Sequence, residues 1–265
     1  MIKTTLILSC ALISTAATAQ VPAPLLAIPD KIVLEADFGK ARNLPKNIWQ
    51  RRQGTRWAVA EGVLRGEQSS PEYQASKKDH FGYEPRLSIP VTPANFIASF
   101  RIRFVGGTET GIVPFIEFDH HVCRVRFNRD GAILLADHEV WKVADAPGFV
   151  WESGCWYSIT AERKDSEFVM QIKDGPTLYA DHPSFAGSAP SGGNGFGVAG
   201  PRKGQVEIDD IVIWSIKSDD TANWQATKTQ MPKFTPVQVK EPKPKKAPTR
   251  KSPIKRSPAG KADKN

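Results

Sequence analysis

Glu117 and Asp119 are the side chains of this 265-residue sequence best suited to acid–base chemistry. They are two residues apart, so on a β-strand both would project from one face of the sheet. Retaining cleavage of a glycosidic bond uses two carboxyl groups about 5 Å apart, one of them held protonated. We therefore treat Glu117 and Asp119 as weak catalytic candidates. The alternative is a polar sheet face on which they pair with Arg124 and Arg126.

Aromatic and basic side chains around this pair could bind a ligand. Trp141 and Trp151 flank a segment with Gly and Pro that we predict to be a loop, whereas Trp57 and Trp214 are expected in the core. Indole rings offer large apolar faces, and arginines donate hydrogen bonds to hydroxyl or acidic groups. The predicted ligand-binding residues are Glu117, Asp119, Arg124, Arg126, Trp141 and Trp151.

Spacings typical of other chemistries are missing from the sequence. Its five histidines show no His-x-His or His-x-x-x-His pattern, and no Gly-x-Ser-x-Gly, P-loop or Gly-x-Gly-x-x-Gly motif occurs. We therefore predict no zinc site, no nucleophile elbow and no phosphate loop.

Short runs that alternate between apolar and polar residues must position these side chains. The pattern is clearest from Phe96 to Phe104, and similar runs cover residues 32–38, 121–128, 168–172 and 206–214. Period-two alternation predicts strands with one buried face, and the Asp-Gly pairs at 130–131 and 174–175 predict hairpins. The sequence therefore predicts an all-β protein, either a sandwich or a closed barrel.

Three motifs resemble the concanavalin A-like lectin/glucanase superfamily. They are the opening strand Glu35-Ala36-Asp37-Phe38, the segment 57–66 that is similar to a W-x-V-x-x-G-x-L-x-G hairpin, and the closing strand 204–214 with its Ile208-Asp209-Asp210-Ile211 centre. The arrangement is also similar to secreted bacterial domains of the 3-keto-disaccharide hydrolase-like type. The resemblance implies a two-sheet antiparallel jelly-roll sandwich over residues 30–217. That fold hosts lectins, hydrolases and adhesion modules, so it implies little about activity.

The resemblance also bears on whether Glu117 and Asp119 are catalytic. Laminarinase-type glycosidases use a strand motif Glu-x-Asp-x-x-Glu, but Val122 stands at its third position here. The incomplete motif favours an exported carbohydrate-binding protein that does not hydrolyse its ligand. A glycoside-cleaving hydrolase or lyase on the same fold is the alternative, so the sequence leaves open whether this protein is an enzyme.

Related sugar-binding modules hold a structural Ca²⁺ between their first and last strands, and no other cofactor is predicted. Carboxylates at the matching places here are Glu35, Asp37, Asp209 and Asp210. Calcium takes six to eight oxygen ligands, which these groups and nearby carbonyls could supply. The alternative follows from strand alternation, with Asp209 facing solvent and Asp210 bonded to a loop.

Cys123 and Cys155 are the only cysteines after the first 19 residues. Each is expected on the inward face of a strand, and an exported protein with two cysteines could join them in a disulfide. Two buried free thiols are the alternative.

Residues 1–19 are predicted to be a secretory signal peptide. Lys3 precedes a short apolar stretch, and Ala17-Thr18-Ala19 matches a cleavage site that would leave Gln20 first. We expect the protein to be secreted or held in the periplasm or cell envelope. Residues 20–29 are predicted to be a linker, and no later apolar run could span a bilayer.

Residues 218–265 are predicted to form a disordered Lys/Pro-rich tail. From residue 228 onward the chain has 12 basic and 2 acidic side chains, whereas residues 20–227 have a net charge of −3. This distribution argues against a specific nucleic-acid-binding fold, which carries its basic stripe on the domain itself. The tail could bind cell-envelope polysaccharide or other polyanions, which makes a structural envelope protein a third hypothesis. The alternative is a solvated extension.

Overall fold

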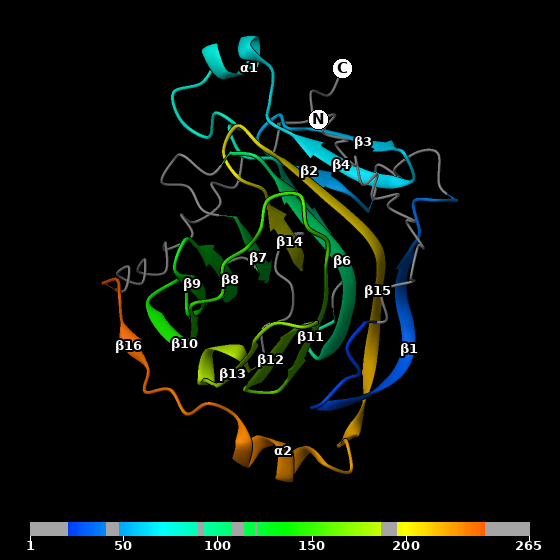
Figure 1. Cartoon of the computed structure of the whole chain (residues 1–265), viewed down its shortest axis with the longest axis vertical. Coiled ribbons are helices and arrows are strands. Elements are labelled where there is room, and N and C mark those ends of the chain that lie inside the picture. The colour runs from blue at the N-terminus through cyan, green and yellow to red at the C-terminus, as the bar shows by residue number, and fades with distance from the viewer. Residues whose placement is uncertain are drawn as a thin grey trace, which may run out of the picture.

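The segments that alternate between apolar and polar residues form β-strands, and these strands make up two antiparallel sheets that face each other (Figure 1). The computed structural model describes residues 21–40, 48–89, 93–107, 114–119, 121–186 and 195–241. The predicted signal peptide and the basic residues beyond 241 lie outside these ranges. The fold class is the predicted one, an all-β two-sheet sandwich.

The first sheet is organised around the long strand β15 (Gln205–Asp220). One side of β15 pairs with β6 (Phe96–Val105); along its other side it pairs first with β4 and then with β1 (Ala27–Ala36). The order is β13-β12-β11-β6-β15-β4-β3. Its other strands are β3 (Arg56–Ala60), β4 (Val63–Glu67), β11 (Tyr157–Lys164), β12 (Glu167–Ile172) and β13 (Thr177–Asp181).

The second sheet has the order β16-β10-β9-β8-β7-β14-β5-β2. The hairpin predicted at Asp130-Gly131 joins two of its central strands, β8 and β9. Its strands are β2 (Gln50–Arg51), β5 (Arg86–Ile89), β7 (Phe115–Phe118), β8 (Cys123–Asn128), β9 (Gly131–Ala136), β10 (Trp141–Pro147), β14 (Phe196–Ala199) and β16 (Val237–Gln238).

Alternate side chains from both sheets meet in one apolar core. The ring of Phe118 in the second sheet lies 4.8 Å from that of Phe96 and 5.7 Å from that of Phe168, both in the first sheet. Aromatic pairs at these centroid distances add to the free energy gained by burying apolar area. We call the sheet faces that line this core inner and the opposite faces outer.

The β3–β4 hairpin has the geometry implied by its sequence motif. Trp57 and Gly66 are cross-strand partners, and a Cβ on Gly66 would lie 2.6 Å from the Trp57 ring. The indole Nε1 donates to the Arg86 carbonyl of the second sheet at 3.0 Å. Trp57 therefore belongs to the core, as predicted, and it ties the two sheets together.

The two cysteines differ from the predicted arrangement. Cys123 is buried in the core, but Cys155 is exposed in a turn before β11, and both are free thiols. The prediction placed Cys155 within a strand, but β11 begins only at Tyr157, so Cys155 lies before the strand. The disulfide is therefore not present in this structure.

Both ends of the described chain pack on the sandwich. β15 runs past residue 217 to Asp220, and α2 (Trp224–Gln230) follows with the Trp224 side chain fully buried. Trp224 packs with Leu26 and Ala27 of the N-terminal segment, which was predicted to be a linker. Residues 218–241 are therefore structured: Trp224 packs on the outer face of the first sheet, and β16 pairs with β10 at the edge of the second sheet.

Helices contribute little to the fold. α1 (Pro71–Ala75) is capped by Ser70, whose side chain accepts from the Tyr73 N–H, and a short 3₁₀ turn spans Pro183–Phe185. Within the described residues, no helix has the length and apolarity needed to cross a membrane.

Candidate functional site

The outer face of the second sheet carries a row of six residues aligned across its strands, four of them polar. Hydrogen-bonded register aligns Ser88 with Gly197, Gly197 with Glu117, and Glu117 with Arg124. The row continues through Leu135 to Lys142. Because the neighbouring residues in each strand point into the core, this row is fixed by the same alternation that builds the sandwich.

Two carboxylates on this face share one guanidinium. Arg124 donates from Nε to Glu117 Oε2 at 3.0 Å and pairs through Nη1 with Glu139. Its side chain is only 3% exposed, and its guanidinium stacks 3.9 Å from the centre of the Phe115 ring. A bidentate, buried arginine of this kind is held in one orientation. Arg124 is thus a positioning residue for both glutamates.

The Glu139 carboxylate contacts several basic side chains of the site. It accepts from Arg126 Nη2 at 2.8 Å and lies 3.1 Å from His121 Nδ1, in addition to its contact with Arg124. Burial acts to raise the pKa of Glu139, but the bond to His121 and the nearby arginines lower it to about 2. Glu139 is therefore ionised at neutral pH and anchors the partly exposed Arg126 side chain.

The loop that presents Glu139 has an unusual backbone. Asp137, His138 and Glu139 all have positive φ, between 49° and 67°. Three consecutive non-glycine residues in this region are uncommon, and such strain persists only where the surrounding contacts hold it. The ion pairs of Glu139 are contacts of that kind.

Glu117 and Asp119 do not share a face, contrary to prediction. β7 ends at Phe118, and Asp119 follows with a φ of +56°, which turns its carboxylate toward Arg163 Nη1 at 2.5 Å. Arg163 lies on the inner side of the first sheet, so this buried pair joins the two sheets. Burial raises the pKa of Asp119, and the Arg163 guanidinium works against that rise.

The two predicted binding tryptophans lie away from this face. Trp151 packs against Phe104, Phe127 and Tyr157, with ring centroids between 4.1 and 4.7 Å. Trp141 opposes Ala136, whose side chain points into the core, and it packs partly against that core. Of the six predicted ligand-binding residues, the structure brings Glu117, Arg124 and Arg126 together.

His121 and Glu139 belong to this cluster but were not among the predicted site residues. A sequence signal existed for the loop, because Asp137-His138-Glu139 separates two strand-like runs. Nothing in the spacing shows that the Glu139 side chain folds back over β8.

Three of the four predicted calcium ligands cluster on the first sheet. Oxygens of Asp37, Asp209 and Asp210 lie within 4.8 Å of one another, whereas Glu35 is not part of the group. Lys40 pairs with Asp37 at 2.8 Å, and Arg101 pairs with both Asp209 and Asp210. Backbone N–H groups of residues 38 and 39 occupy two further carboxylate oxygens. A calcium ion needs six to eight oxygens, so this ion-pair network does not fit it without losing its cations.

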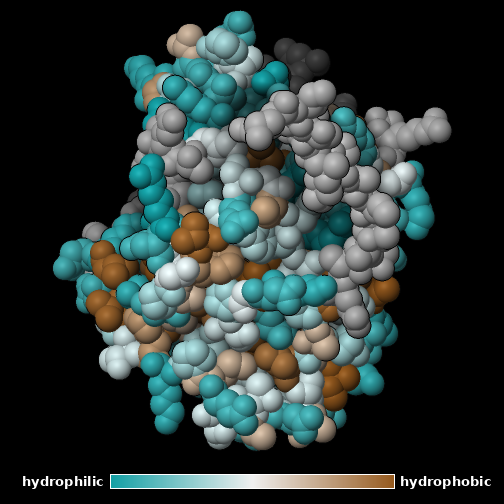
Figure 2. Space-filling view, in the orientation of Figure 1, coloured by the Kyte–Doolittle hydropathy of each residue, from teal (hydrophilic) through white to brown (hydrophobic). Residues whose placement is uncertain are grey.

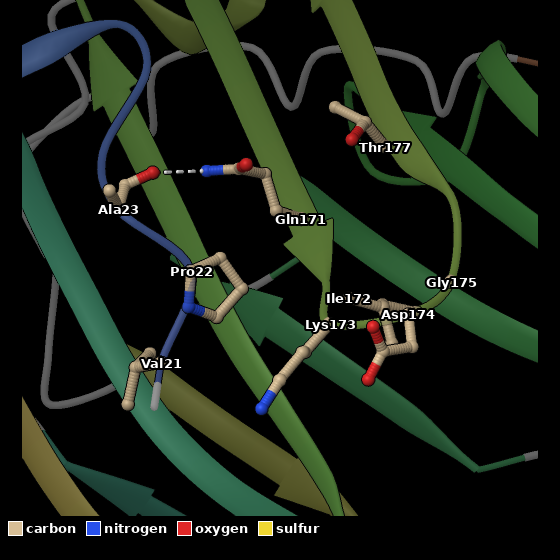
Figure 3. A pocket seen from close by; sticks show the side chains of 9 residues that line it. All are labelled: Val21, Pro22, Ala23, Gln171, Ile172, Lys173, Asp174, Gly175 and Thr177. Carbon is tan, nitrogen blue, oxygen red and sulfur yellow. Dashed lines mark hydrogen bonds between the residues drawn. The ribbon is translucent and has the colours of Figure 1, made fainter. Parts of the chain in front are cut away.

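A separate cavity of about 450 Å³ opens beside the N-terminal segment (Figure 3). Val21, Pro22 and Ala23 form one wall, and residues 171–177 of the β12–β13 hairpin form the other. Gln171 Nε2 donates to the Ala23 carbonyl across the top at 2.8 Å. None of the predicted site residues lines this cavity.

No protein-family model matches the sequence, and no curated protein matches it. Among solved structures, a Bacillus subtilis protein of unknown function with a galectin-like fold matches with 10% identity and a TM-score of 0.51, covering 71% of this chain and 97% of that chain. A carbohydrate-binding module, CBM66 from Bacillus subtilis, matches with 11% identity and a TM-score of 0.43, covering 64% and 98%. The lumenal domain of VIP36, in a Ca²⁺/Man3GlcNAc-bound form, has 9% identity, a TM-score of 0.47 and coverage of 79% and 99%.

The galectin-like match supports the two-sheet fold described above. β1 and β15, which carry the opening and closing motifs, are paired as the resemblance implies. The chain therefore has a two-sheet antiparallel sandwich fold that is similar to the galectin-like fold of that protein.

Proposed function

We propose that this protein binds carbohydrate on the outer face of its second sheet and does not cleave it. The observation that carries the proposal is the set of polar groups already fixed by Glu139 and Glu117 before any ligand arrives. Arg126 and His121 are about one-third exposed and are held by Glu139. Preorganised donors lose little conformational entropy when they bind hydroxyl groups.

The charge states on this face support binding over hydrolysis. A retaining glycosidase needs one carboxyl group that stays protonated near neutral pH. The pKa of Glu139 is lowered to about 2, Glu117 is bonded to Arg124, and Asp119 is turned into the sandwich. The two carboxylates of this face, Glu117 and Glu139, are thus both engaged by the guanidinium of Arg124.

We expect Arg126→Ala to weaken glycan binding by about 10- to 100-fold, the loss of one or two hydrogen bonds from a charged donor. The ligand is first found on an array of neutral and acidic oligosaccharides, and its Kd is then measured by calorimetry. Arg56→Ala is the matched control, because Arg56 is also an exposed arginine paired with a glutamate, at 2.9 Å, but on the first sheet.

Three results would count against this proposal. They are equal affinities for the two variants, an array with no ligand, and release of reducing ends from the bound glycan, which would favour the hydrolase or lyase alternative. Calcium and EDTA are expected to give the same Kd, since the carboxylates of the acidic cluster are already paired. Calcium-dependent binding would restore the predicted metal site.

We also propose that the protein is exported. Support comes from the sequence alone: Lys3, the apolar stretch that follows it, and the Ala17-Thr18-Ala19 site. Mass spectrometry of the protein from a bacterial periplasm or culture medium is expected to find a chain that starts at Gln20. A chain with an intact N-terminus in the cytoplasm would contradict export.

A further inference from the structure

A stack of three side chains lies at the end of the sandwich where β5 begins and β14 ends. The rings of Phe81 and Tyr83 are stacked with their centroids 5.2 Å apart, and the Arg202 guanidinium lies 4.3 Å from the centre of the Tyr83 ring. All three residues are partly exposed. We call this group the aromatic platform. None of its members belongs to the candidate site described above.

The backbone of the platform is held on both sides. The Ser69 side chain donates to the Phe81 carbonyl, and the Ser69 N–H donates to the Gly82 carbonyl at 2.8 Å. Gly82 has a φ of +71°, and a Cβ there would lie 2.1 Å from a backbone oxygen, so the position requires glycine. The Lys203 N–H donates to the Tyr83 carbonyl at 3.1 Å. The platform is therefore fixed before a ligand binds, which lowers the entropy cost of binding.

The platform combines an apolar ring with an arginine whose hydrogen bonding is incomplete. The buried Nε of Arg202 has no hydrogen-bond partner in the described part of the chain. A guanidinium stacked on an aromatic ring keeps its N–H groups in its own plane, where they donate to ligand oxygens. Phe81 adds an apolar surface beside these donors. Apolar rings with a few polar donors are typical of small-molecule and sugar sites.

The surface at this end of the molecule is polar. Figure 1 places the loop of residues 200–204, drawn in yellow, beside the segment that carries α1. Figure 2 shows mainly hydrophilic surface over that segment, at the top of the view. An aromatic stack in such surroundings suits a hydroxylated ligand better than an apolar one.

Arg86 lies between the platform and the candidate site. Pairing across the second sheet aligns Arg86 with Ala199, Ala199 with Phe115, and Phe115 with Arg126. Three strand spacings place the Arg86 and Arg126 backbones about 14 Å apart. The Arg86 guanidinium lies 5.2 Å from the centre of the Phe115 ring, on which Arg124 also stacks. The buried Nε of Arg86 likewise has no hydrogen-bond partner among the described residues.

We propose that the ligand is an oligosaccharide chain several units long, which extends from the candidate site along Arg86 to the aromatic platform. The inference rests on the proposed function, because it names the size of the glycan for the same site and adds a second contact to it. One sugar ring packs its C–H face on the platform, and Arg202 donates to its oxygens. A disaccharide bound at Arg126 does not span the about 14 Å to Arg86 and the platform beyond it.

The test compares disaccharides with hexasaccharides of four series, the laminari-, xylo-, manno- and galacturono-oligosaccharides. In a series that binds, calorimetry is expected to show at least about tenfold tighter binding of the hexasaccharide. Arg202→Ala is expected to lower the hexasaccharide affinity about tenfold, the loss of a hydrogen bond from a charged donor, and to leave the disaccharide affinity unchanged. Arg126→Ala is expected to weaken the binding of both.

Two further variants separate the platform from its surroundings. Lys77→Ala is the matched control, because Lys77 also lies over an aromatic ring, 4.7 Å from the centre of Tyr73, next to α1. It is expected to leave both affinities unchanged. Phe81→Leu keeps apolar bulk without the aromatic ring, and we expect it to weaken hexasaccharide binding alone, by about threefold or more. Melting curves check that each variant folds.

Three outcomes would overturn this inference alone. They are equal affinities for disaccharide and hexasaccharide, an Arg202→Ala chain with undiminished hexasaccharide affinity, and a disaccharide affinity that Arg202→Ala lowers as far as the hexasaccharide affinity. Each leaves the proposed function standing if Arg126→Ala still weakens binding. If no hexasaccharide binds, in these series or on the array, the proposed function itself fails.

Discussion

Arg163→Met is expected to lower the free energy of unfolding by about 3–5 kcal/mol, the usual cost of removing one partner from a buried ion pair. Arg163 is fully buried, pairs with Asp119 at 2.5 Å and donates from Nε to the Ala94 carbonyl. Methionine fills similar space but leaves the Asp119 carboxylate buried without its counter-charge. Chemical denaturation at neutral pH measures the loss.

A second variant separates the charge effect from packing. Replacing Asp119 with leucine in the Arg163→Met background removes the uncompensated charge, so part of the lost stability should return. Arg56→Met, which removes an exposed pair with Glu67, is expected to cost less than about 1 kcal/mol. If Arg163→Met is as mild as Arg56→Met, the pair does not hold the two sheets together.

The sandwich was predictable because strand alternation is a local property of the sequence. Residues 96–104 alternate over their whole length, and β6 occupies them with every second side chain in the core. Both Asp-Gly pairs lie at hairpins, as predicted, but only Asp174, with a φ of +57°, has the left-handed backbone of a type I′ turn. Gly131 already belongs to β9, where it lies opposite Asn128. The predicted jelly roll needed only these local signals and the three motifs.

The site was predictable only in part, because its geometry depends on contacts between distant segments. Glu117 and Arg124 lie on adjacent strands of a hairpin, so their pairing follows from a short turn. The approach of Glu139 depends on three positive-φ residues, and Asp119 leaves the strand one residue earlier than alternation implies. Neither change of direction is encoded in residue type alone.

The C-terminal segment shows how composition can mislead. Its lysines and prolines predict a segment without a packed core. The prediction of a disordered tail follows this composition and gives no weight to Trp224. That indole is fully buried against Leu26, Ala27 and Ile97 in the structure. A large aromatic side chain in an otherwise polar stretch was the signal for an attached helix.

Stability is expected to fall between pH 5 and pH 8 because of Glu162 on the outer face of the first sheet. Its carboxyl group is fully buried and accepts from the N–H groups of Leu25, Leu26 and Ala27 at 2.7–2.9 Å. Burial raises its pKa to about 7, and the three N–H donors act in the opposite direction. Folded Glu162 is therefore protonated in mildly acidic solution.

The sign follows from comparing this pKa with the ordinary value of 4.5. A carboxyl group whose pKa is higher in the folded state stabilises fully below pH 4.5 and loses that contribution as the pH rises through about 7. The whole contribution is about 3 kcal/mol. Release of the N-terminal segment should accompany the loss, because residues 25–27 lie against this carboxyl and their departure lets the ionised group regain water.

Glu162→Gln keeps the shape of the side chain and cannot ionise, so its unfolding free energy should be flat where the unmodified protein loses stability. His182 contributes with the opposite sign, since burial lowers its pKa below 6.5. The informative quantity is therefore the difference between the two pH profiles, measured by denaturation at several pH values, with amide exchange at residues 25–27 as a local readout. The unfolding free energy of the unmodified protein, minus that of Glu162→Gln, should fall by about 3 kcal/mol from pH 5 to pH 8. Parallel profiles would mean that the three N–H groups keep Glu162 ionised throughout, and that burial does not dominate its charge.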